Sequence, residues 1–274
     1  MDNIYTMTTK GIGDEYRRKL AAVSNAAKGI ITPTLVAGQL NVQHQEAGRI
    51  LSRWNKQGWV KRIKRGVYIP VPADDLTGEA TVEDSWVLAD RLFSPGYIGG
   101  FSAVKHWDLS EQIFETTTFF TVKQVKDRQP VIGNTRFQLK TISPYKVFGT
   151  QPVWRDSSKV LVSDPTKTIV DLLDDPAMAG GMRVVRDIFL EYKKTDWFNV
   201  SQLINYAIQM KNKTILKRFG FLMEVEGLFD LIKEYNLTEK ISSGYSLFDP
   251  GIKNTSVIRK WNLKIPEIWK QKND

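Results

Sequence analysis

The apolar positions between Thr32 and Pro70 change from a helical spacing to an alternating one. Residues 43–57 carry apolar side chains three and four positions apart, the spacing that places them on one face of a helix. These side chains are Ala47, Ile50, Leu51 and Trp54. Gly58 follows at the position where a glycine commonly ends a helix. From Trp59 to Ile69 apolar and basic residues alternate, which predicts two short strands joined by a basic tip.

Two further helices are predicted before this one. Thr32 is suited to cap a helix over residues 33–39, and the missing N–H of Pro33 is harmless at its first position. Residues 40–42 then form a tight turn, and Asp14 is suited to cap an earlier helix over residues 15–27. Helix, tight turn, helix and basic hairpin form the layout of a winged helix-turn-helix DNA-binding domain, which we predict for residues 1–72.

The positive charge of the chain is concentrated in this first domain. Residues 1–72 contain 12 Lys and Arg against 4 Asp and Glu, a net charge of +8, whereas the whole chain carries +9. The remaining 202 residues are therefore close to neutral. Such segregation indicates a surface that binds phosphates. A solvated basic face on an ordinary small domain is the alternative.

The helix at 43–57 and the hairpin supply the candidate DNA contacts. Residues early in a recognition helix meet base edges in the major groove, where Gln pairs with adenine and Arg with guanine. We predict base or near-base contacts for Gln43, His44 and Arg49, and phosphate contacts for Arg53 and Lys56. The hairpin cations are expected to meet phosphates or to enter the minor groove. The predicted DNA-binding residues are Gln43, His44, Gln45, Arg49, Arg53, Lys56, Lys61, Arg62, Lys64 and Arg65. For any single one of them, plain solvent exposure is the alternative.

A second, larger domain is predicted at residues 80–274. Pro70, Pro72 and Gly78 surround two aspartates and break both periodicities, so we predict a linker at 71–80. Stretches rich in β-branched and aromatic residues predict strands at 115–123, 135–143 and 157–164, and a closing strand at 257–265. Helices are predicted at 82–93, at 103–107 with Ser102 as the cap, and at 165–173, 182–192, 201–211 and 214–226. The strands precede most of the helices, so the predicted fold class is α+β.

The chain offers few groups for catalysis. It has no cysteine and only two histidines, which excludes thiolate chemistry and makes a histidine-based metal site or triad improbable. The strongest candidates for a Mg²⁺ site are the carboxylates Asp164, Asp171, Asp174 and Asp175. We favour structural roles instead, with Asp164 as a helix cap and Asp171 in a hydrogen bond or ion pair. Glu224 and Glu226 are predicted to form ion pairs with Arg218 and Lys217. We predict no enzyme activity, no metal and no cofactor.

The N-terminal sequence lacks the apolar run of a signal peptide, and no stretch approaches the length of a membrane span. We therefore expect a soluble, cytoplasmic protein.

Five stretches of the chain carry a family resemblance. They are RGVYIP at 65–70, GGFSAVKHWDLSEQ at 99–112, VSDPTKTIVDLL at 162–173, LKRFGFLME at 216–224, and an ending formed by LFDPGIK at 247–253 with KWNL at 260–263. In this order they resemble the AbiEi family, the antitoxin halves of bacterial abortive-infection toxin–antitoxin pairs. A tryptophan-rich extension, Trp261–Trp269, departs from the family's ending.

The resemblance implies that the N-terminal winged helix represses the protein's own operon by binding repeats in the promoter. It also implies that the C-terminal domain opposes a toxin of the nucleotidyltransferase class, without requiring a stable complex. Two rival hypotheses remain. The first is a ligand-responsive transcriptional regulator without a toxin partner, with a small-molecule pocket in residues 80–274. The second is a metal-dependent nuclease or nucleotidyl-transfer enzyme that uses Asp164, Asp171 and Glu224.

Overall fold

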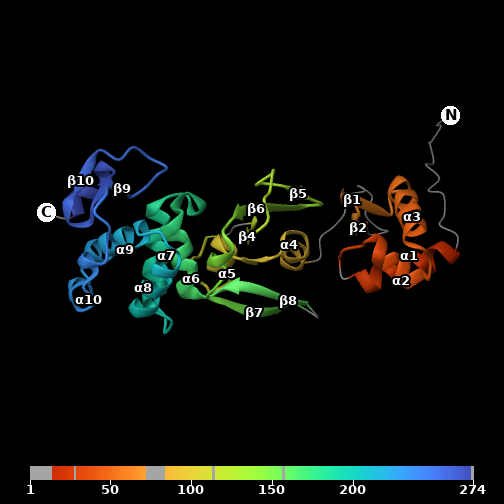
Figure 1. Ribbon diagram of the computed structural model, residues 1–274, viewed down its shortest axis with the longest axis horizontal. Coiled ribbons are helices and arrows are strands. Elements are labelled where there is room, and N and C mark those ends of the chain that lie inside the picture. Colours follow the sequence, from red (N-terminus) through yellow and green to blue (C-terminus); the bar gives the residue numbers. More distant parts are fainter. Residues whose placement is uncertain (1–13, 28, 72–83, 113–114, 156–157, 273–274) are drawn as a thin grey trace, which may run out of the picture. The chain divides into compact units, whose positions relative to one another are not determined.

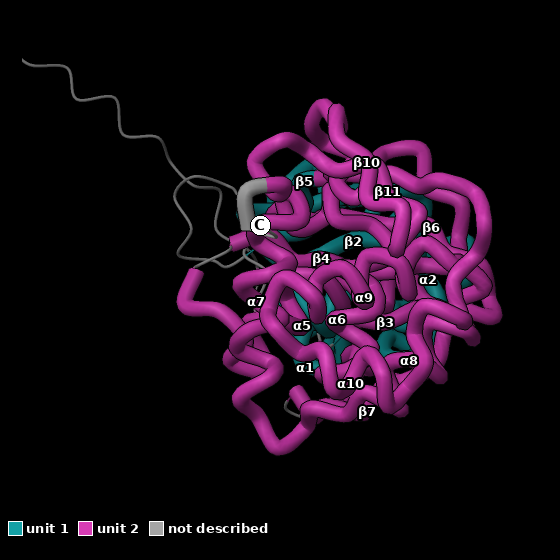
Figure 2. Tube along the Cα trace, turned by 90° about the vertical axis from the view of Figure 1, so that its left-hand side faces the viewer, with its two compact units in different colours: residues 1–88, 131–135 teal, residues 89–130, 136–274 magenta. Residues whose placement is uncertain are grey.

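The computed structural model describes residues 14–27, 29–71, 84–112, 115–155 and 158–272. The chain divides into two compact units, residues 1–88 with 131–135 and residues 89–130 with 136–274 (Figure 2). The linker predicted at 71–80 lies outside the described residues except for residue 71. Helices and strands are mixed along the chain (Figure 1), in agreement with the predicted α+β class.

Three helices and a hairpin build the first unit as far as residue 71. They are α1 (Asp14–Ala27), α2 (Pro33–Leu40), α3 (His44–Lys56), β1 (Val60–Lys64) and β2 (Val67–Pro70). β1 and β2 pair antiparallel, and an antiparallel bridge joins Ile31 to Tyr68. The predicted order of elements is therefore present. Helix boundaries differ by one residue: α1 begins at Asp14, α2 ends at Leu40, and α3 lacks both Gln43, which is its N-cap residue, and Gln57.

Local chemistry explains where these helices begin and end. The Thr32 hydroxyl oxygen accepts a hydrogen bond from the backbone N–H of Leu35 at 3.2 Å, which caps α2 as predicted. Asn41 adopts a left-handed conformation with φ 51°, which ends α2 and turns the chain toward α3. The shared core consists of Val23, Ala27, Ile31, Val36, Ala47, Leu51, Trp54, Val60 and Tyr68.

A six-stranded mixed sheet follows along the chain, with strand order β5-β6-β4-β3-β8-β7. Its strands are β3 (Gly96–Ile98), β4 (Thr117–Thr121), β5 (Val131–Ile132), β6 (Thr135–Thr141), β7 (Thr150–Arg155) and β8 (Ser158–Ser163). β4 runs parallel to β6 and β3 to β8, whereas the β3–β4 and β7–β8 pairs are antiparallel.

The C-terminal half of the second unit is mainly helical. Its helices are α6 (Pro165–Asp174), α7 (Met182–Lys194), α8 (Val200–Gln209), α9 (Thr214–Val225) and α10 (Phe229–Glu234), whereas α4 (Ser85–Phe93) and α5 (Gly100–His106) precede β4 in the chain. A small sheet of order β10-β11-β9 closes the unit, with β9 (Ser246–Leu247), β10 (Ser256–Ile258) and β11 (Leu263–Ile265). α6 and α9 are buried along most of their length and form the centre of the helical core.

Several features of this region differ from the sequence prediction. α5 begins at Gly100, so Ser102 lies inside the helix, where its hydroxyl accepts a hydrogen bond from the Thr118 N–H at 2.8 Å. The predicted strand at 257–265 is two strands, because a 3₁₀ turn and the left-handed Asn262 (φ 49°) interrupt it. β5, β7 and α10 had no predicted counterpart. Within the described residues, no helix combines the length and apolar character needed to cross a bilayer.

Candidate nucleic-acid interface

All ten residues predicted to contact DNA are exposed. Arg49, Arg53 and Lys56 lie on α3, and the four basic hairpin residues lie on β1 or in the turn after it. Glu46 is the only acidic residue between positions 43 and 70, against seven Lys and Arg. The two elements therefore present a basic surface.

The outward face of α3 follows from its buried face. Ala47, Leu51 and Trp54 are fully buried. With 3.6 residues per turn, the opposite side of the helix carries Gln45, Arg49, Ser52 and Lys56, at intervals of three and four. Gln43 and His44 lie at the N-terminal end of the helix and outside this stripe. The structure thus groups Arg49 with Gln45 and Lys56 more closely than with Gln43.

The hairpin is held against α3 by a specific contact. The backbone N–H of Arg62 donates a hydrogen bond to Asn55 Oδ1 at 2.8 Å, which ties β1 to the C-terminal turn of the helix. On β1, Val60 is buried and Lys61, Arg62 and Lys64 are exposed. Gly66 takes φ 73° in the turn, a conformation that glycine adopts without strain. The basic side chains of the hairpin are therefore carried on a backbone anchored to α3.

α1 adds two residues that the sequence reasoning did not include. Arg53 Nη1 donates a hydrogen bond of 3.4 Å to the Tyr16 hydroxyl oxygen. Lys19 pairs with Glu15 at 2.7 Å, and that hydrogen bond raises the pKa of Lys19 above its usual value. The Tyr16 and Trp59 rings lie 6.4 Å apart. The only sequence signal for these residues was their place on a predicted helix beside the basic one.

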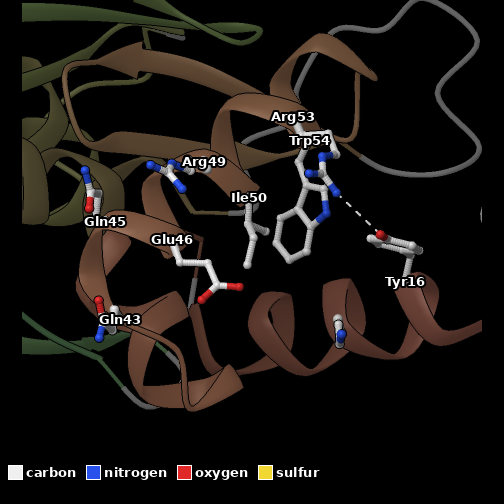
Figure 3. Close-up of a pocket in the computed structure, with 9 residues that line it drawn as sticks. Tyr16, Gln43, Gln45, Glu46, Arg49, Ile50, Arg53 and Trp54 are labelled. Carbon is white, nitrogen blue, oxygen red and sulfur yellow. Dashed lines mark hydrogen bonds between the residues drawn. The ribbon is translucent and has the colours of Figure 1, made fainter.

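A hollow of about 390 Å³ lies between α1 and α3 (Figure 3). Its walls are Tyr16, Lys19, Gln43, Gln45, Glu46, Arg49, Ile50, Arg53 and Trp54. The indole Nε1 of Trp54 is buried and has no hydrogen-bond partner in the part of the chain that the structure describes. A buried N–H group without an acceptor is uncommon in folded proteins and calls for an explanation.

In the second unit, the carboxylates considered for a metal site have structural roles. Asp164 caps α6 by accepting a 2.7 Å hydrogen bond from the Lys167 N–H, as predicted. Asp171 forms a buried ion pair with Lys167, which confirms the predicted structural role. Asp174 accepts hydrogen bonds from Lys146 at 2.9 Å and Asn212 at 2.8 Å. Among the described residues, no three His, Cys, Asp or Glu side chains are grouped so that they could hold a metal ion.

The buried pair on α6 is completed by a tyrosine from the sheet. Lys167 Nζ donates to the Tyr97 hydroxyl at 2.8 Å, and that hydroxyl donates to Asp171 Oδ2 at 3.0 Å. Burial raises the pKa of Asp171 and lowers that of Lys167. Burial, with the hydrogen bond to Asp164, also raises the pKa of Tyr206 to about 12. These groups have partners inside the unit and join α6 to β3 and α8.

The ion pairs predicted along α9 were assigned to the wrong partners. Glu224 pairs with Lys260 and accepts a 2.8 Å hydrogen bond from the Trp261 indole, and Glu226 pairs with Arg186. Arg218 instead donates to backbone carbonyl oxygens at the end of α6, in β9 and at Phe248 directly after it. Helix spacing alone favours neighbours within α9, whereas the partners in the structure are between 29 and 45 positions away in the sequence.

Comparison with known proteins identifies a shared fold. No protein-family model matches the chain, and no curated protein matches it. Among solved structures, the chain is similar to the crystal structure of the RV2827C protein from Mycobacterium tuberculosis, with a TM-score of 0.58 and 13% sequence identity. The similarity covers 93% of this chain and 92% of that chain. The two chains therefore have the same fold over nearly their whole length.

Proposed function

We propose that this protein is a sequence-specific DNA-binding transcriptional regulator in which the first unit acts as a winged helix. The observation that supports this most is the exposed basic surface of α3 and the β1–β2 hairpin. Seven Lys and Arg against one acid within 28 residues give a local charge that suits a phosphate backbone. The excess is densest here: after residue 72, residues 123–155 also hold seven Lys and Arg against one acid, but over 33 residues.

In this proposal α3 enters the major groove with its outward stripe facing the bases. Arg49 sits at the centre of the stripe and is suited to bind guanine O6 and N7, while Gln45 is suited to bind adenine. Arg53 and Lys56, one and two turns further along, would then meet the phosphates. The hairpin cations would contact the backbone beside the groove, as a wing does.

We further propose that the protein is an AbiEi-type antitoxin that represses its own operon in the cytoplasm. The resemblance of the five sequence stretches supports this. The second unit would then counteract a toxin of the nucleotidyltransferase class without needing a stable complex. In this role the protein is not an enzyme and uses no cofactor.

The DNA-binding proposal is tested with duplexes selected from a random pool by the full-length protein. Arg49→Gln should relax preference at one base pair and cost about 1–3 kcal/mol of discrimination there. Lys64→Gln with Arg65→Gln should weaken binding to all sequences. The slope of log affinity against log salt should fall by about 0.9 for each lost phosphate contact.

The matched control is Arg183→Gln, an exposed arginine on α7 of the second unit. It should leave both affinity and salt slope unchanged. If the wild-type protein selects no sequence, or if the three variants bind alike, the assignment of this surface is wrong.

The antitoxin proposal is tested by growth rescue. The product of the neighbouring gene is induced in cells that also express the full-length protein, either wild type or with Lys64→Gln and Arg65→Gln. Rescue by both forms would assign the antitoxin activity to the second unit and transcription to the first. Absence of toxicity, or of rescue by the wild type, would favour a ligand-responsive regulator without a toxin partner.

A further inference from the structure

The pocket between α1 and α3 contains a hydrogen-bond donor that lacks an acceptor. Trp54 is fully buried, and its Nε1 has no partner among the described residues. The indole lies between Ile50 and Arg53, and Tyr16 faces it from α1 (Figure 3). Leaving such an N–H without an acceptor is unfavourable. A ligand group that accepts a hydrogen bond from it would therefore bind with a more favourable free energy.

Two further donors meet at the same side of the pocket. The Tyr16 hydroxyl oxygen accepts from Arg53 Nη1, which leaves the hydroxyl hydrogen able to donate (Figure 3). At 3.4 Å this bond is long, and it is exposed, so it is readily exchanged for a better one. An acceptor placed between Arg53 and Tyr16 could take hydrogen bonds from both. Once Arg53 moves off the tyrosine, the acceptor could also reach the indole N–H.

The charges around the pocket select the kind of acceptor. Arg49 and Arg53 line it beside the carboxylate of Glu46, and Lys19, also in the wall, is paired with Glu15 at 2.7 Å. Glu46 lies on the other side of Ile50 and Trp54 from Tyr16 (Figure 3), so the Tyr16 side of the pocket is the more positive one. Three converging donors next to cationic side chains suit a compact oxyanion of the phosphate type, because hydrogen bonds to a charged acceptor are the strong ones.

We propose that the α1–α3 pocket is an oxyanion site in which Trp54, Arg53 and Tyr16 donate to one phosphate-type group. The group can come from two sources. One is a backbone phosphate of the bound duplex, and this source rests on the proposed DNA-binding function. The other is a free phosphate-bearing small molecule, which would compete with DNA for Arg53.

The test follows the indole N–H of Trp54 by two-dimensional ¹H–¹⁵N NMR on the full-length protein. Its signal is identified as the one missing from Trp54→Phe, a change that keeps an aromatic ring and removes the donor. Inorganic phosphate and a selected duplex are then added in separate titrations. Trp86→Phe, at another buried tryptophan that is not part of the pocket wall, is the matched control.

A downfield shift of the Trp54 signal with either addition supports the site. A shift with inorganic phosphate alone identifies a free oxyanion as the source, and a shift with the duplex alone identifies the DNA backbone. Trp54→Phe and Tyr16→Phe should each lower the affinity for whichever ligand shifts the signal by about 10-fold or more, because each removes a hydrogen bond to a charged group. Trp86→Phe should leave its affinity unchanged.

The proposal is overturned if neither addition moves the Trp54 signal, or if Trp54→Phe binds both phosphate and DNA as the wild type does. The phosphate titration contains no DNA. A protein that fails to bind any duplex can therefore still pass it, and failure of the DNA-binding proposal is distinguished from failure of this one.

Discussion

Replacing Lys167 with methionine should destabilise the second unit by about 4 kcal/mol at pH 7. Lys167 and Asp171 are almost completely buried, and they form a cluster with the Tyr97 hydroxyl. Within this cluster, the variant leaves the Asp171 carboxylate with only the Tyr97 hydroxyl as a hydrogen-bond donor. An unpaired buried carboxylate takes up a proton. Holding a carboxyl with an ordinary pKa of 3.8 in its protonated form at pH 7 costs about 1.36 kcal/mol for each pH unit, or about 4 kcal/mol in all. Breaking buried ion pairs has a penalty of the same size, about 3–5 kcal/mol.

The stability of the Lys167→Met variant should also depend on pH. In the variant, folded Asp171 holds a proton that the unfolded chain releases above about pH 4. The folded state therefore binds more protons, and stability rises as pH falls. Between pH 7 and pH 5 the penalty should shrink by about 1.4 kcal/mol per unit.

Urea unfolding at pH 7, 6 and 5, followed by tryptophan fluorescence, measures both quantities. Lys194→Met is the control, because Lys194 pairs with Glu191 on the exposed side of α7 and should have little effect. Replacing all three groups, with Lys167→Met, Asp171→Leu and Tyr97→Phe, should recover most of the loss because no unpaired polar group remains. A penalty below about 1 kcal/mol, or one equal at pH 5 and pH 7, would show that the pair is not desolvated as the structure indicates.

Three further predictions concern the helical core. Gly220→Ala should lower the melting temperature by roughly 6–12 °C, because the new Cβ would lie 2.0 Å from a carbon of the Trp261 ring. The control Gly38→Ala, in open space on α2, should be neutral or stabilising. Arg218→Lys should cost about 3 kcal/mol or more and increase hydrogen exchange in β9, since one ammonium group cannot replace a guanidinium bound to four carbonyl oxygens. The pKa of Asp174 is lowered, because hydrogen bonds from neighbouring groups and nearby lysines outweigh the effect of its burial. The contribution of this carboxylate to folding stability should therefore be present above about pH 4 and lost as the pH falls further. Asp174→Asn should abolish that part of the acid unfolding curve.

Each of these has a direct control or contrary result. Arg183→Lys, at an exposed arginine of α7, should leave hydrogen exchange in β9 unchanged. Equal melting temperatures for Gly220→Ala and the wild type would mean that Trp261 can move aside without loss. An acid unfolding curve that is the same for Asp174→Asn and the wild type would contradict the role given to that carboxylate.

The elements that were predicted well are those with a local cause. Thr32 caps α2 and Asp164 caps α6 through their own side chains, and the spacing of Ala47, Leu51 and Trp54 requires one buried face on α3. The four basic residues of the hairpin are exposed, because charged residues that alternate with apolar ones on a short hairpin point to solvent, and exposure alone does not test their predicted contact with DNA.

The features that were missed depend on contacts distant in sequence. β7 contains Pro152 and is exposed at three of its six positions and buried at none, so it lacks the pattern of a buried strand. It lies at the edge of the sheet, where proline is tolerated. Lys167 and Lys217 are fully buried, which is rare for lysine and has no local signal. The pocket beside Trp54 was missed because it needs α1 and α3 together.

The stretches on which the proposed AbiEi relationship rests have a consequence for testing it. Lys167, Asp171 and Arg218 lie within them and are buried in contacts that hold α6, α9 and β9 together. The resembling residues in that region therefore stabilise the second unit. Residues that would contact a toxin or its target must be sought among exposed side chains. Trp154 on the edge strand β7 and Phe229 on α10 are the large exposed aromatic residues outside those stretches with the greatest exposure, 67% and 57%. In the growth-rescue assay, loss of activity in Arg218→Lys would thus show only that the unit must fold, whereas loss in Trp154→Ser with unchanged stability would locate a working surface.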